Sequence, residues 1–419
     1  MIKQKISDGV TGTFVENRRF KNNLITVSFM IKPEKTELPA MSLVTTLMAE
    51  GCEKYPNFTL LNRKLDLLYG ADIIKSDAVC GDFRIYSLSV KTVDDKFSEN
   101  GNLLQSAELL SDLCFEYYLN GVSYKDEDLE REKRVLAEKV AASLNNKRVY
   151  ATEKLKSIMC KDEPFGLPVS GTVDEIKSVS KKDIENAQKR LMQNAFIDIQ
   201  FTGGSLPDGL FDIFGKKLKL IKRNPTTDFT QIVKSAEPER EASEKMAVSQ
   251  GKLLLGFRSN NKRTVSQSAA DLLMSDIFGG GPYSKLFTVV REKMSLCYYC
   301  SSSVNRFKGI MTVSSGVEKD NIEKAKEEIL NQLSLMKKGE FSDETIADSK
   351  RAIIGSLKSV GDDIGATARW YQNRLTETAL SPEEYIEEIK NVTREDIIAS
   401  AKSFELDTVF VLSPETEEK

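Results

Sequence analysis

An eleven-residue pattern occurs twice in this chain, and the two copies are separated by about half of its 419 residues. Residues 174–184 read DEIKSVSKKDI, and residues 387–397 read EEIKNVTREDI. In each copy a hydroxyl residue, Ser180 or Thr393, is followed three positions later by an aspartate, which is the arrangement of a helix-capping box. A helix is therefore predicted to begin at each of these residues. Repetition over this distance indicates two halves of similar fold.

The segments around the two copies follow a similar order. Alternating or continuous apolar runs predict strands in the first half at 24–31, 83–91 and 196–201, and in the second half at 252–257, 296–304, 310–317 and 408–412. Helical periodicity is centred on Leu47–Met48, on Leu273–Met274 and on 321–337. This order favours an α+β fold of two homologous domains, each a mostly antiparallel sheet with helices packed on one face.

The predicted N-terminal domain covers residues 1–222, and the predicted C-terminal domain covers residues 248–419. Residues 223–247 lie between them and contain two prolines, many charges and no sustained hydrophobic period. Such a segment is typical of a linker between domains.

The composition excludes several classes of protein. Hydrophobic residues make up 40% and charged residues 29% of the chain, which is the balance of a folded globular protein. A net charge of −3 argues against binding to nucleic acid, which needs a basic excess. No apolar segment is long enough to span a membrane, and no secretory signal is recognisable, so a cytoplasmic protein is expected. The six cysteines are then not expected to form a disulfide framework.

The chain contains no histidine, so it cannot form a histidine-ligated zinc site by itself. Yet residues 51–56, GCEKYP, resemble the stretch after the zinc-binding helix of the pitrilysin/insulinase peptidases, also called inverzincins, and the resemblance covers nearly the whole chain. Active members carry the motif H-x-x-E-H on that helix. Counting back places the two histidine positions at Ser42 and Thr46 and the position of the catalytic base at Thr45.

The third zinc ligand of the family is a glutamate on a later helix, which residues 130–138 resemble, with Glu138 at the ligand position. A lone glutamate does not hold zinc, and hydroxyl groups are poor zinc ligands. Ser42, Thr45 and Thr46 are therefore expected to be ordinary helix residues, and Glu138 is expected to be a carboxylate on a helix surface.

A second motif lies in the C-terminal half. Residues 278–284, FGGGPYS, form a glycine-rich turn before a helix over 284–293. Gly279, Gly280 and Gly281 would let the backbone adopt positive φ angles and approach another chain closely. Arg291 falls in the last turn of that helix, and Tyr298 follows in the next strand.

This pair resembles the substrate-binding arginine and tyrosine of the same family. The resemblance implies that Arg291 and Tyr298 hydrogen-bond a peptide carbonyl and stabilise the oxyanion formed during hydrolysis. The alternative is an arginine that compensates a helix dipole and a tyrosine that only packs.

The family includes heterodimeric peptidases in which one subunit carries zinc and the other supplies the arginine and tyrosine. Residues 145–151 and 159–166 resemble the bacterial YmfF/YfmF-like group, whose members are usually encoded with a zinc-bearing sister. The resemblance implies a non-catalytic, peptide-binding subunit with no cofactor of its own. Its expected partners are a zinc-motif-bearing homologous peptidase and a peptide substrate, with a homodimer as a possible state of the isolated chain.

Two alternatives of other classes stay open. One is a structural or scaffold protein that uses a degenerate peptidase fold. The other is a thiol oxidoreductase that uses Cys297 and Cys300, a C-x-x-C motif. In a regular strand, residues three apart point to opposite faces, so the motif favours packing over redox chemistry.

Overall fold

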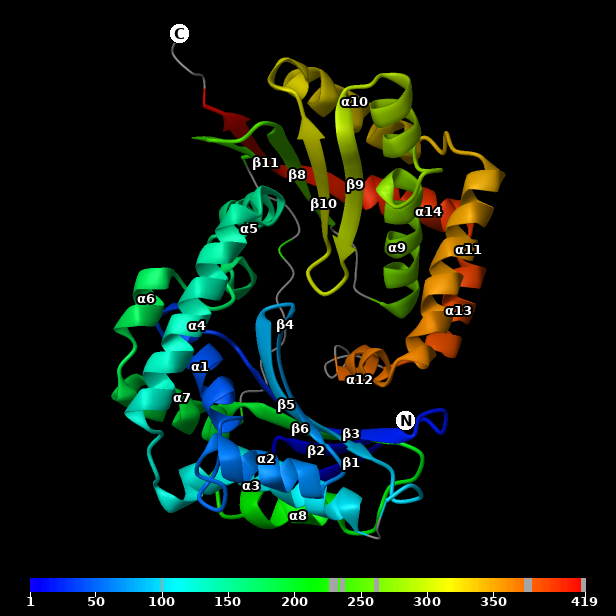
Figure 1. Cartoon of the computed structure of the whole chain (residues 1–419). Helices are drawn as coiled ribbons and strands as arrows, with labels where there is room; N and C mark the ends of the chain where they lie inside the picture. Colours follow the sequence, from blue (N-terminus) through cyan, green and yellow to red (C-terminus); the bar gives the residue numbers. More distant parts are fainter. Residues whose placement is uncertain (99–100, 226–232, 234–237, 260–263, 373–378, 416–419) are drawn as a thin grey trace. The chain divides into compact units, whose positions relative to one another are not determined.

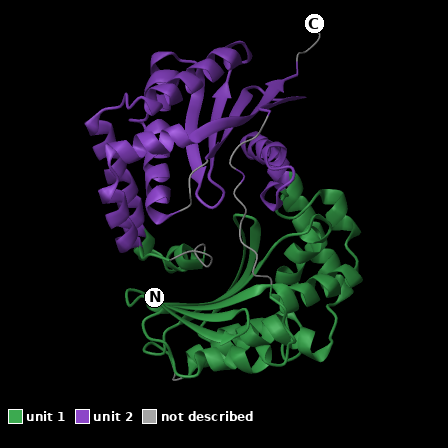
Figure 2. Ribbon diagram, turned by 180° about the vertical axis from the view of Figure 1, so that it is seen from behind, with its two compact units in different colours: residues 1–141, 167–229, 360–381 green, residues 142–166, 230–359, 382–419 purple. Residues whose placement is uncertain are grey.

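A computed structural model describes residues 1–98, 101–225, 233, 238–259, 264–372 and 379–415. The chain divides into two compact units (Figure 2). Unit 1 comprises residues 1–141, 167–229 and 360–381, and unit 2 comprises residues 142–166, 230–359 and 382–419. Each unit is thus built mainly from one half of the chain, with one segment taken from the other half.

Unit 1 is built on a six-stranded sheet in the order β1-β2-β6-β3-β5-β4. Its strands are β1 (Ile2–Ser7), β2 (Val10–Glu16), β3 (Asn22–Ile31), β4 (Asp72–Cys80), β5 (Phe83–Val93) and β6 (Phe196–Gly203). The pair β2/β6 is parallel, and the other pairs are antiparallel. Alternation along β3 sends Ile25, Val27 and Phe29 into an apolar core, where Phe29 meets Phe115 of a covering helix.

The helices of unit 1 cover both faces of this sheet. They are α1 (Leu38–Met48), α2 (Phe58–Leu67), α3 (Asn102–Asn120), most of α4 (Asp126–Asn145), α6 (Val173–Ser178), α7 (Lys181–Asn194), α8 (Leu210–Leu218) and α12 (Ile364–Gln372), with short 3-10 turns at Lys35–Glu37 and Val360–Asp362. Helix α12 comes from the C-terminal half and packs on β3 and β6. Its Gln372 Nε2 donates to Ser28 Oγ at 2.9 Å, on the polar side of β3.

Unit 2 repeats the plan with a five-stranded sheet in the order β7-β11-β8-β10-β9. Its strands are β7 (Arg240–Met246), β8 (Gly251–Ser259), β9 (Cys297–Asn305), β10 (Ile310–Val317) and β11 (Phe404–Pro414). Here β7/β11 is the parallel pair. Strand for strand, this sheet matches β2-β6-β3-β5-β4 of unit 1, as the sequence repeat predicts.

The helices of unit 2 include one segment from the N-terminal half. They are α5 (Lys147–Met159), α9 (Val265–Gly279), α10 (Ile322–Lys337), α11 (Asp343–Ser359), α13 (Pro382–Asn391), α14 (Arg394–Ser403), the π-helix η3 (Leu286–Lys293), and 3-10 turns at Pro164–Gly166 and Lys319–Asn321 (Figure 1). Helix α5 packs on β8 and β11 through Ala151 and Leu155, which join Leu254 and Phe410 in a small apolar cluster.

Helices α5 and α12 are therefore exchanged between the halves. Helix α5 precedes the pair α6 and α7 along the chain, and α12 precedes the corresponding pair α13 and α14. Helix α5 packs on β8 and β11, and α12 packs on the corresponding strands β3 and β6. The predicted α+β class with two homologous domains is confirmed. The exchanged helices add a cover on the second face of each sheet, which the sequence pattern does not predict.

The local predictions at the repeat are confirmed. Ser180 and Thr393 are helix N-caps, and in both cases the hydroxyl accepts from the backbone N–H of the aspartate three residues on, while that carboxylate accepts from the cap backbone. Each predicted strand is present with ends shifted by a few residues. Within the predicted linker 223–247, however, Arg240–Met246 form β7, while 226–232 and 234–237 lie outside the described residues.

Among the described residues, no helix combines the length and the apolar character needed to cross a membrane.

Candidate functional site

The positions of the family's zinc motif lie on α1. Ser42 and Thr45 are buried, and Ser42 Oγ donates to Ser170 Oγ at 3.1 Å. Thr46 Oγ1 donates to the Ser42 carbonyl at 3.2 Å, which is the usual bond of a threonine within a helix. All three hydroxyls therefore lie in ordinary helical positions.

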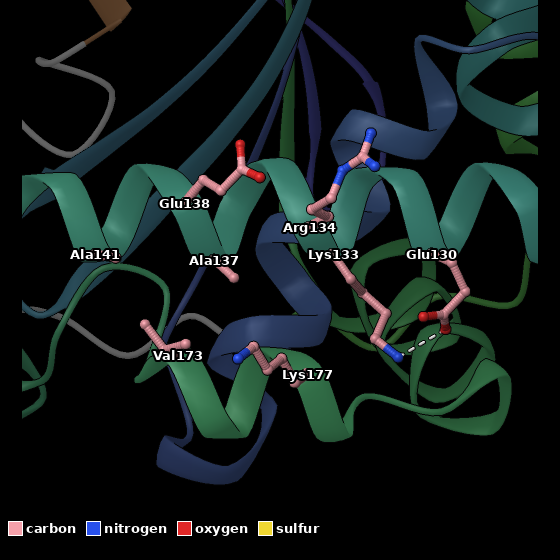
Figure 3. A pocket seen from close by; sticks show the side chains of 8 residues that line it. All are labelled: Glu130, Lys133, Arg134, Ala137, Glu138, Ala141, Val173 and Lys177. Carbon is pink, nitrogen blue, oxygen red and sulfur yellow. Dashed lines mark hydrogen bonds and ion pairs between the residues drawn. The ribbon is translucent and has the colours of Figure 1, made fainter.

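Glu138 lies on the exposed side of α4 and lines a cavity of about 390 Å³ between α4 and α6 (Figure 3). The cavity is lined by Glu130, Lys133, Arg134, Ala137, Glu138, Ala141, Val173 and Lys177. Lys133 Nζ is paired with Glu130 at 2.8 Å. In the described part of the chain, no cluster of three or more metal-ligating side chains occurs. These residues do not fit a zinc ion.

The three glycines of the turn in unit 2 pack closely against other residues of the same unit. A Cβ on Gly279 would lie 2.6 Å from the backbone nitrogen of Ser302, and one on Gly280 would lie 2.1 Å from Asp276 Oδ1. One on Gly281 would meet the Tyr283 ring at 2.8 Å. The expected close approach thus occurs within this chain. The expected positive φ is wrong, because none of the three glycines adopts it.

The segment after this turn departs from regular structure. The predicted helix over 284–293 is a π-helix, η3, whose wide turns close with the Met294 N–H donating to the Val289 carbonyl at 2.9 Å. Ser295, two residues beyond its end, has a φ of 51°, which is rare for a residue other than glycine. π-helices and left-handed residues cost conformational free energy and are concentrated at functional sites.

Arg291 lies in the last turn of η3, as predicted. Its guanidinium stacks on the Phe287 ring, with 4.4 Å from Cζ to the ring centroid, and its Nε lies 3.6 Å from Glu292 Oε1. The side chain is 40% exposed. Within the described residues no hydrogen bond occupies its N–H groups, so they are available to a ligand.

Tyr298 is the extra residue of a β-bulge. On β10, Gly316 lies opposite Tyr299 and Val317 lies opposite Cys297, so Tyr298 has no opposite residue. The bulge turns its side chain outward, where it is 64% exposed. Its hydroxyl donates to Glu318 Oε1 at 3.1 Å, and this bond raises the pKa of the phenol.

The bulge also corrects the expectation for the C-x-x-C motif. Cys300 lies opposite Ser315, and Cys297 lies opposite Val317. Ser315 and Val317 are two residues apart and point to the same side of the sheet, so both cysteines point to that side as well. The prediction that they lie on opposite faces is wrong because it assumed a strand without a bulge.

Two residues that hold Arg291 and Tyr298 in place are not part of any motif recognised in the sequence. Phe287 provides the ring beneath Arg291, and Glu318 fixes the Tyr298 hydroxyl. Phe287 could have been found from its spacing, since it is one helical turn before Arg291. Glu318 is brought close only by the pairing of β9 with β10.

The chain has similarity to peptidases of the M16 family. Residues 178–353 match the family model of the peptidase M16 inactive domain. A protein of Bacillus subtilis described as a probable inactive metalloprotease, YmfF, is 28% identical over 96% of both chains. An uncharacterized zinc protease of Rickettsia bellii is 23% identical over 78% of both chains.

The crystal structure of a conserved protein from Enterococcus faecalis covers 100% of this chain and 99% of its own, with a TM-score of 0.91 at 25% identity. Fold, whole-length similarity and the loss of the zinc ligands agree with one another. The chain is therefore similar to M16-family metallopeptidases, among them one described as a probable inactive metalloprotease.

Proposed function

We propose that this chain is a non-catalytic, peptide-binding subunit that works with a zinc-bearing homologous peptidase. Arg291 and Tyr298 would contact the peptide, and the partner would supply the metal, the ligands and the base. The partner, the peptide and the cytoplasmic location are parts of this proposal.

One observation carries the proposal. The residues 286–300 combine a π-helix, a left-handed residue and a β-bulge, and this irregular backbone holds Arg291 and Tyr298 in exposed positions. The corresponding part of unit 1, from α2 to β4, also has a left-handed residue, Tyr69, but it has neither a π-helix nor a β-bulge, so the sheet can be built without these two features. A guanidinium with unused donors and a phenol suit the recognition of peptide carbonyl groups.

The test is reconstitution with a zinc-bearing homologue and measurement of peptide cleavage. Arg291→Ala and Tyr298→Ala are each expected to lower kcat/KM by about tenfold to a hundredfold, because a hydrogen bond to a charged group contributes about 1.5–3 kcal/mol and one to a phenol somewhat less. A rise in KM alone would assign the residues to peptide binding, and a fall in kcat would assign them to the developing oxyanion.

A matched control is Arg351→Ala on α11, since Arg351 is also an exposed arginine of unit 2 that pairs with a neighbouring carboxylate, Asp348. This variant should leave cleavage unchanged. If the Arg291 and Tyr298 variants behave like the control, the proposed role is wrong and the scaffold alternative gains support.

Substitutions in the glycine-rich turn do not separate these alternatives. Gly279 and Gly280 have no room for a side chain within their own unit, so their replacement would disturb the fold whatever the function.

A further inference from the structure

Cys297 and Cys300 are neighbours on one side of β9 because of the bulge at Tyr298. Both are free thiols. The two thiols lie close enough to act on each other, and the Ser315 hydroxyl of β10, opposite Cys300, acts on both while it donates to the Tyr299 carbonyl at 3.0 Å. Arg291 of η3 is close enough for its charge to act on Cys297.

These contacts distinguish the two sulfurs. The hydrogen bond from Cys300, with further help from Ser315 and the positive charge of Arg291, lowers the pKa of Cys297 to about 7 although burial opposes this. The same interaction raises the pKa of Cys300 well above its ordinary value. Of the two sulfurs, Cys297 is therefore the one that loses its proton more readily.

At three other buried cysteines, by contrast, burial has the largest effect on the pKa. Burial raises the pKa of Cys52 and of Cys160 to about 12 and raises that of Cys114 further. Cys297 retains 9% of its surface at an edge strand of the sheet, which gives a small oxidant access. A thiolate beside a protonated second thiol is the arrangement of an attacking and a resolving cysteine.

We propose that Cys297 and Cys300 form a redox pair that a hydroperoxide oxidises to a disulfide and that a dithiol reduces again. This is a modification of the chain itself and does not depend on the peptide-binding role.

The reaction has two steps. The Cys297 thiolate attacks the terminal oxygen of the hydroperoxide, so that an S–O bond forms and the O–O bond breaks. The departing alkoxide or hydroxide takes a proton from water, which leaves a sulfenic acid. The Cys300 sulfur then attacks the Cys297 sulfur, an S–S bond forms, and the S–O oxygen leaves as water with the Cys300 proton. Two electrons pass from the thiol pair to the peroxide.

The test uses the full chain with hydrogen peroxide, followed by alkylation, digestion and mass spectrometry without reduction. The peptide that holds Cys297 and Cys300 should lose the mass of two hydrogens and both alkylation sites, and dithiothreitol should restore them. In the untreated chain at pH 7, iodoacetamide should label Cys297 at least ~10-fold faster than Cys52 or Cys114.

In Cys300→Ser, peroxide should leave a sulfenic acid on Cys297 that dimedone traps, while Cys80→Ser should still form the disulfide. The proposal fails if native Cys297 is labelled no faster than Cys52, or if peroxide produces only sulfinic and sulfonic acids at Cys297. The labelling rates are measured on the unaltered chain. They therefore test the reactivity of Cys297 even if Cys300→Ser does not fold.

Discussion

At the scale of single residues, Gly280 shows how tightly the turn before η3 is built. A Cβ at this position would lie 2.1 Å from Asp276 Oδ1, and the other oxygen of that carboxylate accepts hydrogen bonds from Tyr283 and Ser349. Gly280→Ala is therefore expected to displace Asp276 and to destabilise the chain by about 1–3 kcal/mol. Chemical denaturation followed by circular dichroism measures this change.

Gly355 provides the matched control. It lies within α11, and a Cβ there would meet nothing within 4 Å. Gly355→Ala should stabilise the chain by about 0.5–1 kcal/mol, because alanine loses less backbone entropy in a helix. Equal effects of the two substitutions would contradict the packing described for Gly280.

The pKa of Cys297 leads to a second prediction at this scale. Since the thiolate is the reactive form, alkylation of Cys297 should rise as the pH increases through about 7 and level off above it. Arg291→Gln removes a positive charge that favours the thiolate. In this variant, the pH at which the alkylation of Cys297 reaches half of its maximal rate should therefore be higher. Arg351→Gln is the control, and a profile that is the same in both variants would show that Arg291 does not act on this sulfur.

At the scale of elements, α5 is held to the sheet of unit 2 by a buried ionic network at its C-terminal end. Arg258 of β8 pairs with Glu163 and with Asp407, each at 2.6 Å, and Lys308 pairs with the second oxygen of Glu163 at 2.6 Å. Arg258 is 2% exposed and Lys308 is fully buried. Both cations depend on these carboxylates for compensation.

Glu163→Gln should therefore destabilise unit 2 by about 3–5 kcal/mol, because it removes one partner from buried cations. Glu387→Gln, which breaks an exposed pair with Lys390, should change stability by less than about 1 kcal/mol. Thermal unfolding of both variants gives the comparison. A small effect of Glu163→Gln would mean that water reaches the network.

Helix α5 also supports β9, the strand that carries Tyr298, from the other side of the sheet. Arg148 of α5 stacks on the Tyr299 ring at 4.5 Å and donates to Ser301 Oγ at 3.1 Å. Tyr299 comes directly after the bulge that exposes Tyr298, and Ser301 follows two residues later. Loss of α5 would thus loosen the strand that presents this side chain.

The sequence predicts regular features well and interruptions poorly. Ser180 and Thr393 were recognisable as caps because a capping box depends only on residues three apart. The bulge at Tyr298 is not recognisable from the sequence, because it arises from the pairing of β9 with β10. The residues 284–293 likewise have no sequence pattern that distinguishes a π-helix from an α-helix. Arg291 and Tyr298 could be named from the family resemblance, whereas the joint orientation of Cys297 and Cys300 needed the register.

At the scale of the whole molecule, the exchange of α5 and α12 limits how the chain can be divided. A fragment of residues 1–222 lacks α12, which covers Leu24 and bonds to Ser28 and Ser87. A fragment of residues 223–419 lacks α5, which covers Leu254 and Phe410. A cut in the predicted linker therefore separates each sheet from one of its covering helices.

Neither fragment alone is expected to unfold cooperatively on heating, and mixing the two should restore a cooperative transition. Circular dichroism of each fragment and of the mixture tests this. If residues 1–222 alone unfold with the midpoint of the intact chain, α12 contributes nothing to the stability of unit 1.

The exchange also has a consequence for the timing of synthesis. The sheet of unit 1 is complete when β6 ends at Gly203, but the helix for its second face begins only at Ile364. At about 5–20 residues per second, a ribosome needs on the order of ten seconds to make the segment between them. During that interval the polar side of β3 lacks its covering helix. Likewise, β7 lacks its parallel neighbour β11, which is made after the other strands of the described residues. Unit 1 can therefore finish folding only after α12 has been made, and unit 2 only after β11 has been made.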